Sequence, residues 1–405
     1  MSSQVMAARP SLSQSPGRSY RIQSIDVLRG VLMVVMALDH SRDYFSGATV
    51  NPSDPAHSWP ALFATRWITH ICAPGFILLA GTSVYLQRQR KSAAALTRFL
   101  LTRGLWLIFI ELTVVSFGWS FNIGLPIFQV IWAIGASMIV LAGLQWLPVP
   151  AIGLFAAIVI FGEDMLDRVH AASFGRWSNV WRILHERGPL VYHRHPVAIY
   201  GYPLIPWVAV MALGFCFGTI VVQTPERRQR ISALIGAASL AMFAVLRLTH
   251  GYGDPGAGWQ RLGSPAYRAM SFFAVEKYPP SLHYLLGTLG VVFLLFAVAD
   301  HAGQHARIPR LRGWLDVYGR VPFFFYILHI FLIHALALGL AVATRPDWRY
   351  WITPDAVFTS HLEGWGYGLP VVYAVWLGVV LVLYPWCAWF SRLKDRRRDW
   401  WLSYL

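Results

Sequence analysis

Runs of about 20 apolar residues recur along the whole chain, and they most constrain what it can fold into. A helix of that length crosses the roughly 30 Å of hydrocarbon in a bilayer, and it satisfies its own backbone hydrogen bonds there. Only 13% of the 405 residues are charged, while 56% are hydrophobic; a soluble domain carries about 25% charge. We therefore expect an all-α, polytopic transmembrane helical bundle whose solvent is the lipid bilayer.

The apolar runs predict about ten spans. They cover residues 25–45, 64–87, 97–119, 123–146, 148–162, 203–223, 230–249, 280–300, 317–343 and 369–391. The fifth run is short and bounded by Pro148 and Pro150, and losing it would reverse the orientation of every later span. We expect a transmembrane domain at residues 22–391, a disordered cytosolic tail at 1–21 and a basic cytosolic tail at 392–405.

The net charge of +15 comes mostly from short basic segments between the apolar runs. With both termini in the cytosol, the basic clusters fall inside, as the positive-inside rule requires. The exception is the loop at residues 163–202, which also carries acids. Topology therefore accounts for the charge, and we expect no nucleic-acid partner. The predicted location is the inner (cytoplasmic) membrane of the cell, as a multi-pass protein.

Three long outer loops remain, at residues 163–202, 250–279 and 344–368. They contain aromatic residues, glycine and histidine. Loops of this length are often functional in compact proteins. They either roof a substrate site on the outer face or serve as solvated connections, and the sequence leaves both interpretations open.

The first predicted span is unusually rich in ionisable side chains. Asp26, Arg29, His40 and Asp43 fall on one stripe of a helix, because the eleven residues from Arg29 to His40 make about three turns, or roughly 16 Å. Asp39 points about 100° away from that stripe. Ionisable groups at bilayer depth are costly and usually face a bundle interior or a wet cavity. The stripe is therefore interpreted as a site; the alternative is a structural network that pairs Asp26 with Arg29 and His40 with Asp43.

The residue types on this stripe suggest separate tasks. Arg29 lies near the inner surface and suits a phosphate or another anion. His40 lies deeper and can take and give a proton near neutral pH. The carboxylate of Asp43, one turn away, is expected to orient the imidazole.

Other ionisable groups in the spans extend the candidate site. Arg66 and His70 in the second span either line the same cavity or form a hydrogen-bonded core. Arg98 and Arg103 open the third span at the inner surface, where they either bind phosphates or anchor the span. His329 in the ninth span is a further candidate for the cavity wall.

Histidines outside the spans do not form a recognisable metal site. His193 and His195 lack further ligands at a suitable spacing. The chain also lacks the HExxH, nucleophile-elbow, Walker and dinucleotide-binding patterns. We expect no bound metal.

Two family resemblances follow from these motifs. An Arg followed after ten residues by a His, within an apolar run that begins SIDVLRG, resembles the first-helix signature of the membrane acyltransferase superfamily that O-acylates sugars. More of the chain resembles bacterial membrane proteins related to heparan-alpha-glucosaminide N-acetyltransferase. The resembling stretches are SIDVLRG, ALDHSRDYF, WITHICAPGFILLAGTS, RFLLTRGLWLIFIEL, YPLIPWVAVMALGFCFG, KYPPSLHYLLGTLG and YGRVPFFFYILHIFLIH.

The resemblances imply acyl transfer from a coenzyme A thioester to a sugar across the membrane. The superfamily motif implies that His40 is catalytic and that Arg29 helps to hold the donor. The heparan-modifying relatives carry Asn at the His40 position and imply a catalytic histidine in the first outer loop, which His57 matches as His57-Ser58-Trp59. The two resemblances therefore nominate different histidines.

The resulting hypothesis is an integral membrane acyltransferase. Its donor would be acetyl-CoA or another acyl-CoA, and its acceptor a sugar or another component of the cell envelope. The alternative is a proton-coupled transporter that uses the same intramembrane His, Asp and Arg groups. Binding of phosphates at the inner surface distinguishes the two, because a transporter has no need of it.

Overall fold

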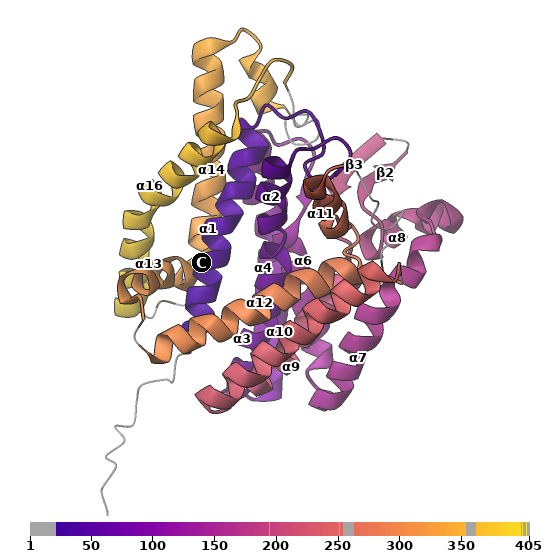
Figure 1. Cartoon of the computed structure of the whole chain (residues 1–405), viewed down its shortest axis with the longest axis vertical. Coiled ribbons are helices and arrows are strands. Elements are labelled where there is room, and N and C mark those ends of the chain that lie inside the picture. Colours follow the sequence, from indigo (N-terminus) through magenta and orange to yellow (C-terminus); the bar gives the residue numbers. More distant parts are fainter. Residues whose placement is uncertain are drawn as a thin grey trace, which may run out of the picture.

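Long helices that run between two ends of a bundle make up most of the molecule (Figure 1). The computed structural model describes residues 22–193, 195–250, 252–253, 263–305, 307–353, 362–397, 399 and 402. The predicted tail at residues 1–21 lies outside these ranges.

The chain crosses the bundle repeatedly, each long helix returning towards the end from which the previous one came. The long helices are α1 (Gln23–Phe45), α2 (Pro60–Thr69) with α3 (Cys72–Arg88), α4 (Ala93–Ile110), α6 (Val130–Leu144), α7 (Val149–Gly162), α9 (Leu204–Val221), α10 (Pro225–Leu248), α12 (Leu282–Gln304), α14 (Pro322–Thr344) and α16 (Leu369–Arg396). The shorter helical elements are η1 (Glu111–Val115), α5 (Ser116–Ser120), η2 (Glu163–Arg168), η3 (Ala171–Trp177), α8 (Ser178–Leu184), α11 (Pro265–Phe273), α13 (Pro309–Arg320) and η4 (Trp348–Ile352).

Eight helical segments of the described chain are long and apolar enough to cross a membrane, so the predicted count of ten is wrong by this measure. Helix α1 has 23 residues but carries too many charges to qualify. Helix α6 has only 15 residues and is about 22 Å long. It is short because residues 121–129, assigned in part to the fourth predicted span, form a turn and strand β1 (Ile127–Phe128). The uncertain fifth span is present as Val149–Arg168.

The predicted outer loop at residues 163–202 is a folded segment. It contains η2, η3 and α8, followed by strands β2 (Gly188–Tyr192) and β3 (His195–Tyr200). Strand β3 pairs in parallel with β1 and antiparallel with β2. The backbone groups of a segment this long need partners, and this three-stranded sheet supplies some of them within an otherwise all-α fold.

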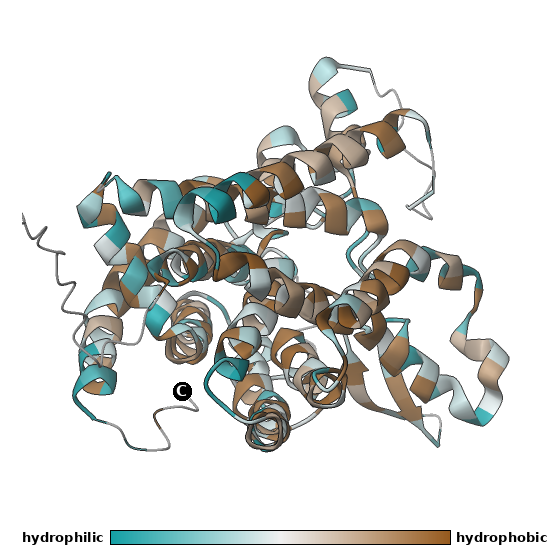
Figure 2. Cartoon of the chain, turned by 90° about the horizontal axis from the view of Figure 1, so that it is seen from below, coloured by the Kyte–Doolittle hydropathy of each residue, from teal (hydrophilic) through white to brown (hydrophobic). Residues whose placement is uncertain are grey.

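Helix α1 lies at the centre of the bundle, where it packs against α3, α12, α13, α14 and α16 (Figure 1). Its apolar side chains Leu28, Leu32 and Ala37 are fully buried. Other helices turn apolar side chains outward, including Leu105 and Ile158, which are 61% and 63% exposed. Figure 2 shows hydrophobic residues along much of the helices. Apolar side chains on the outer surface are what a lipid solvent favours.

Glycine residues allow some helix backbones to meet directly. A methyl group on Gly81 of α3 would lie 2.0 Å from the carbonyl oxygen of Met211 in α9, and one on Gly214 of α9 would lie 2.0 Å from the carbonyl oxygen of Leu78. Small residues at helix contacts are typical of membrane bundles, because they let backbones approach closely. The α3–α9 contact therefore depends on the lack of side chains at these two positions.

Replacing Gly81 with alanine should destabilise the protein by about 1–3 kcal/mol, the usual cost of overpacking. The matched control is Gly378→Ala in α16, where a methyl group would meet nothing within 4 Å and alanine favours the helix. Thermal unfolding in detergent would measure both. Equal melting temperatures for the two variants would contradict the proposed backbone contact.

Candidate functional site

A cavity of about 300 Å³ opens beside α1 and is enclosed mainly by α1, α3, α4, α6 and α14. Its polar lining consists of Arg29, Ser83, Gln87, Arg103, Arg320 and Lys394. Its apolar lining includes Met33, Met36, Phe76, Ile134, Phe323 and Tyr326. One cavity therefore combines four basic side chains with a largely apolar interior, a combination that suits an anionic ligand with a long uncharged arm.

The guanidinium of Arg29 is held in place at the cavity wall. It donates hydrogen bonds to Asp26 Oδ1 at 3.2 Å, to the Gly319 carbonyl oxygen at 3.1 Å and to Ser83 Oγ at 3.2 Å. Gly319 can lie this close to α1 because it has no side chain. A methyl group at this position would be 1.7 Å from the Asp26 carbonyl oxygen. The Asp26–Arg29 pair of the alternative interpretation is thus present, and the same Arg29 also lines the cavity.

His40 lies one turn beyond Met36 on α1, and its partner is His329 of α14. His40 Nδ1 is 2.7 Å from His329 Nε2, and the two rings are stacked with centroids 4.9 Å apart. Tyr326, which lines the cavity, has its ring centroid 6.3 Å from that of His40. The histidine pair therefore lies just beyond the apolar part of the cavity.

The hydrogen bonds of His329 assign the tautomers of the pair. His329 Nδ1 is 2.9 Å from the Phe325 carbonyl oxygen, which can only accept, so Nδ1 carries the hydrogen. In a neutral ring, His329 Nε2 then accepts a hydrogen bond from His40 Nδ1–H. This leaves the lone pair on His40 Nε2 available to take a proton.

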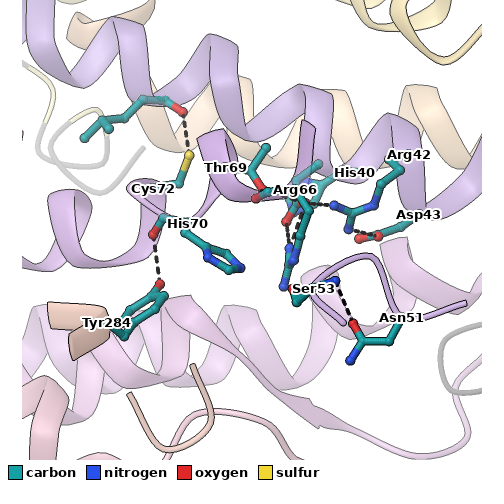
Figure 3. Close-up of polar contacts among 12 residues, drawn as sticks. His40, Arg42, Asp43, Asn51, Ser53, Arg66, Thr69, His70, Cys72 and Tyr284 are labelled. Carbon is teal, nitrogen blue, oxygen red and sulfur yellow. Dashed lines mark hydrogen bonds and ion pairs between the residues drawn. The ribbon is translucent and has the colours of Figure 1, made fainter. Parts of the chain in front are cut away.

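A salt-bridge network occupies the C-terminal half of α1, next to His40 (Figure 3). Asp39 accepts hydrogen bonds from Arg66 at 2.6 and 2.7 Å and from Thr69 at 2.8 Å. Arg42 Nη1 is 2.7 Å from Asp39 Oδ1, and Arg42 Nη2 donates to Asp43 at 2.5 Å. Four charges in this network sum to zero.

The contact expected from the sequence between Asp43 and His40 is therefore not the one observed. Asp43 pairs with Arg42, while His329 takes the place beside His40 that was assigned to Asp43. The i, i+3 spacing places His40 and Asp43 on one face of α1. The guanidinium of Arg42, next to Asp43 in the chain, is nevertheless a stronger partner for the carboxylate than the imidazole is. Arg42 was not among the predicted site residues. Its burial in the structure indicates its role as the partner of the two carboxylates.

The remaining predicted residues of the second and third spans, apart from Arg103, lie outside the cavity. Arg66 is bound to Asp39, as above. His70 is buried at the break between α2 and α3, where its ring packs against Tyr284 at 5.4 Å and its carbonyl oxygen accepts from the Tyr284 hydroxyl at 2.8 Å. Arg98 is exposed, whereas Arg103 lines the cavity. Five residues turn a helix by about 140°, so the two arginines face different directions.

His57 lies in the loop between α1 and α2, and its side chain is 72% exposed. Its Nδ1 is 2.6 Å from Asp54 Oδ2, and this hydrogen bond lowers the pKa of Asp54. The carboxylate fixes the ring and leaves Nε2 directed elsewhere. His57 therefore forms an imidazole–carboxylate pair with Asp54, on the surface rather than at the cavity.

Comparison with known proteins places these features in a family. The family model described as heparan-alpha-glucosaminide N-acetyltransferase, catalytic, matches residues 21–248. No curated protein matches the chain. The matched segment contains four helices of the cavity, α1, α3, α4 and α6. Of these, α1 carries Arg29 and His40, and α4 carries Arg103. Because the match covers more than half of the 405 residues, the chain belongs to the heparan-alpha-glucosaminide N-acetyltransferase catalytic family, whose members are membrane acetyltransferases that use acetyl-CoA.

Proposed function

We propose that the protein transfers an acetyl group from acetyl-CoA to an amine or hydroxyl of a sugar or another envelope component. The observation that carries this proposal is the single cavity with a basic lining that leads along α1 towards the His40–His329 pair. A donor with phosphates at one end and a thioester at the other matches both the charge and the length of this arrangement.

The donor would bind through its phosphates to the basic lining of the cavity. Arg29 and Arg103 offer planar guanidinium groups, which suit phosphate oxygens. Met33, Met36 and Phe76 line the path that an uncharged pantetheine arm would follow. Arg29 and Met36 are seven residues apart on α1, or about 10 Å along the axis, and His40 follows one turn later.

His40 would act as the general base. Its Nε2 takes the proton from the acceptor amine or hydroxyl as that group attacks the thioester carbonyl carbon, and the sulfur leaves as the thiol once it has received a proton. His329 acts as a positioning residue, because its hydrogen bond fixes the ring and tautomer of His40. His57 with Asp54 is the rival base, on the surface of the same end of the bundle.

The same proposal assigns the orientation. The polar lining comes partly from Gln87, Arg320 and Lys394, near the helix ends that meet the N-terminus of α1. Because acetyl-CoA is made in the cytosol, this end would face the cytosol, with both termini on that side of a bacterial inner membrane. The sheet and His57 would then face outward, where an envelope acceptor can reach them.

The role of the basic lining can be tested with Arg103→Ala. Loss of a charged hydrogen-bonding group should raise the KM for acetyl-CoA about tenfold or more, which corresponds to roughly 1.4 kcal/mol, and leave the KM for the acceptor unchanged. Arg98→Ala is the matched control, since Arg98 is an exposed arginine of the same helix. The measurement is transfer of labelled acetyl by protein in liposomes, and an equal effect of both variants would contradict the assignment.

The two candidate bases are separated by His40→Ala and His57→Ala. Removing a general base should lower the rate of transfer about 100-fold or more, and we expect this for His40→Ala. His57→Ala should keep most of the wild-type rate. The reverse result would move the chemistry to His57. If wild-type protein binds no coenzyme A and instead moves protons with a substrate, the protein is a transporter.

The positioning role of His329 gives a third expectation. His329→Ala should lower kcat, with little change in the KM for acetyl-CoA, because the residue orients the base without binding the donor. His329→Gln should recover part of the rate, since an amide oxygen can accept from His40 Nδ1–H. Melting temperatures would show whether each variant folds. Equal kcat values for the folded alanine and glutamine variants would argue against the hydrogen bond as the cause.

A further inference from the structure

Three side chains gather at the end of α7, away from the cavity. Glu163 begins η2, Asp167 lies one turn later, and His185 follows the last residue of α8. One donor atom from each residue lies within 4.8 Å of the other two. The side chains of Glu163 and His185 are 2% exposed and that of Asp167 is 14% exposed. The proposed acetyl transfer uses none of them.

The polar atoms of this cluster are close together but poorly paired. His185 Nδ1 is 2.9 Å from Glu163 Oε1, and His185 Nε2 is 3.3 Å from Asp167 Oδ1. Even so, both carboxylate oxygens of Glu163, Asp167 Oδ2 and His185 Nδ1 are buried without a hydrogen bond. A buried polar group that lacks its hydrogen bond costs about 1–3 kcal/mol, and more when it is charged.

The charges of the cluster also do not balance within the protein groups. Two carboxylates carry two negative charges, and an imidazolium would neutralise only one of them. A divalent cation bound to both carboxylates and to a neutral imidazole brings the sum to zero. It would also bind the lone pairs that now have no partner. One ion would therefore account for both the unbalanced charge and the missing hydrogen bonds.

We propose that Glu163, Asp167 and His185 bind a divalent transition-metal ion of the Zn²⁺ class. A nitrogen ligand with two carboxylates suits Zn²⁺ and its neighbours, whereas Ca²⁺ and Mg²⁺ prefer oxygen ligands alone. Three protein ligands leave one position for water. Asp167 also lines a cavity of about 760 Å³ together with Asp164, Arg168 and His170, which provides a route for a hydrated ion.

The bound ion would join the end of α7 to the end of α8. These elements carry the outer segment that leads into the sheet, and Trp181 of α8 packs its ring 5.2 Å from that of His185. The site would therefore stabilise the folded outer segment rather than take part in the chemistry at His40. It revises the expectation that the chain binds no metal.

Binding can be measured on the full-length protein in detergent after treatment with EDTA. Calorimetric titration with Zn²⁺ should give one ion per chain, and Zn²⁺ should raise the melting temperature, while Ca²⁺ should do neither. Glu163→Gln and Asp167→Asn keep the shape of each side chain and should weaken Zn²⁺ binding by more than about 100-fold, beyond the loss typical for residues that only support a ligand. His195→Gln is the matched control: this histidine of the same segment is exposed on β3 and should leave binding unchanged.

Three results would overturn the proposal: no Zn²⁺ binding by the wild type, unchanged binding by both ligand variants, or equal binding of Ca²⁺. A fourth is a metal-independent protein whose stability falls as the pH rises through about 9. Burial lowers the pKa of His185, but the neighbouring carboxylates of Asp167 and Glu163 outweigh it and raise the pKa to about 9. An imidazolium bridge would be present below the unfolded-state pKa and lost above 9. None of these readouts depends on acetyl transfer.

Discussion

An ionisable side chain inside a lipid-facing bundle must find its partner within the protein, and the arrangement around α1 follows from this constraint. Asp39 and Asp43 meet Arg42 and Arg66, and Asp26 meets Arg29. Breaking a buried pair by removing one partner costs about 3–5 kcal/mol, because the remaining charge is left without compensation. The first helix therefore cannot move independently of α2 and α13, which supply Arg66 and the Gly319 carbonyl oxygen.

This pairing divides α1 into two halves with different chemistry. In the C-terminal half, arginines satisfy both carboxylates, so neither carboxylate is left to bind the imidazole of His40. In the N-terminal half, Arg29 is held by three acceptors at the wall of a cavity that also contains Arg103. His40 lies in the C-terminal half, next to Asp39, but pairs with a neutral group, His329. A histidine that is oriented by another histidine, rather than by a carboxylate, keeps its own lone pair for an incoming proton.

Spacing along the chain predicted local relations well and distant ones poorly. Apolar runs located the long helices, and the stripe on α1 correctly put Arg29 on the side of the cavity. Whether Arg98 or Arg103 lines the cavity depends on where α6 and α14 lie relative to α4. The residue pattern of one helix does not contain that information. His329, the partner of His40, lies 289 positions away in the chain. The carboxylate of Asp43, three positions from His40, binds Arg42 instead. The sheet was missed because strands of two to six residues leave almost no periodic signal.

The boundary of the family match divides the site in an informative way. Residues 21–248 supply Arg29, Arg103 and His40, the groups that we propose hold a donor and accept a proton. His329, Tyr326 and Arg320 come from α13 and α14, beyond that boundary. The hydrogen bond that fixes the tautomer of His40 therefore comes from outside the matched segment. It follows that the matched helices contain the proposed reacting groups, whereas the orientation of the proposed base and one side of the cavity depend on the C-terminal helices that pack against α1.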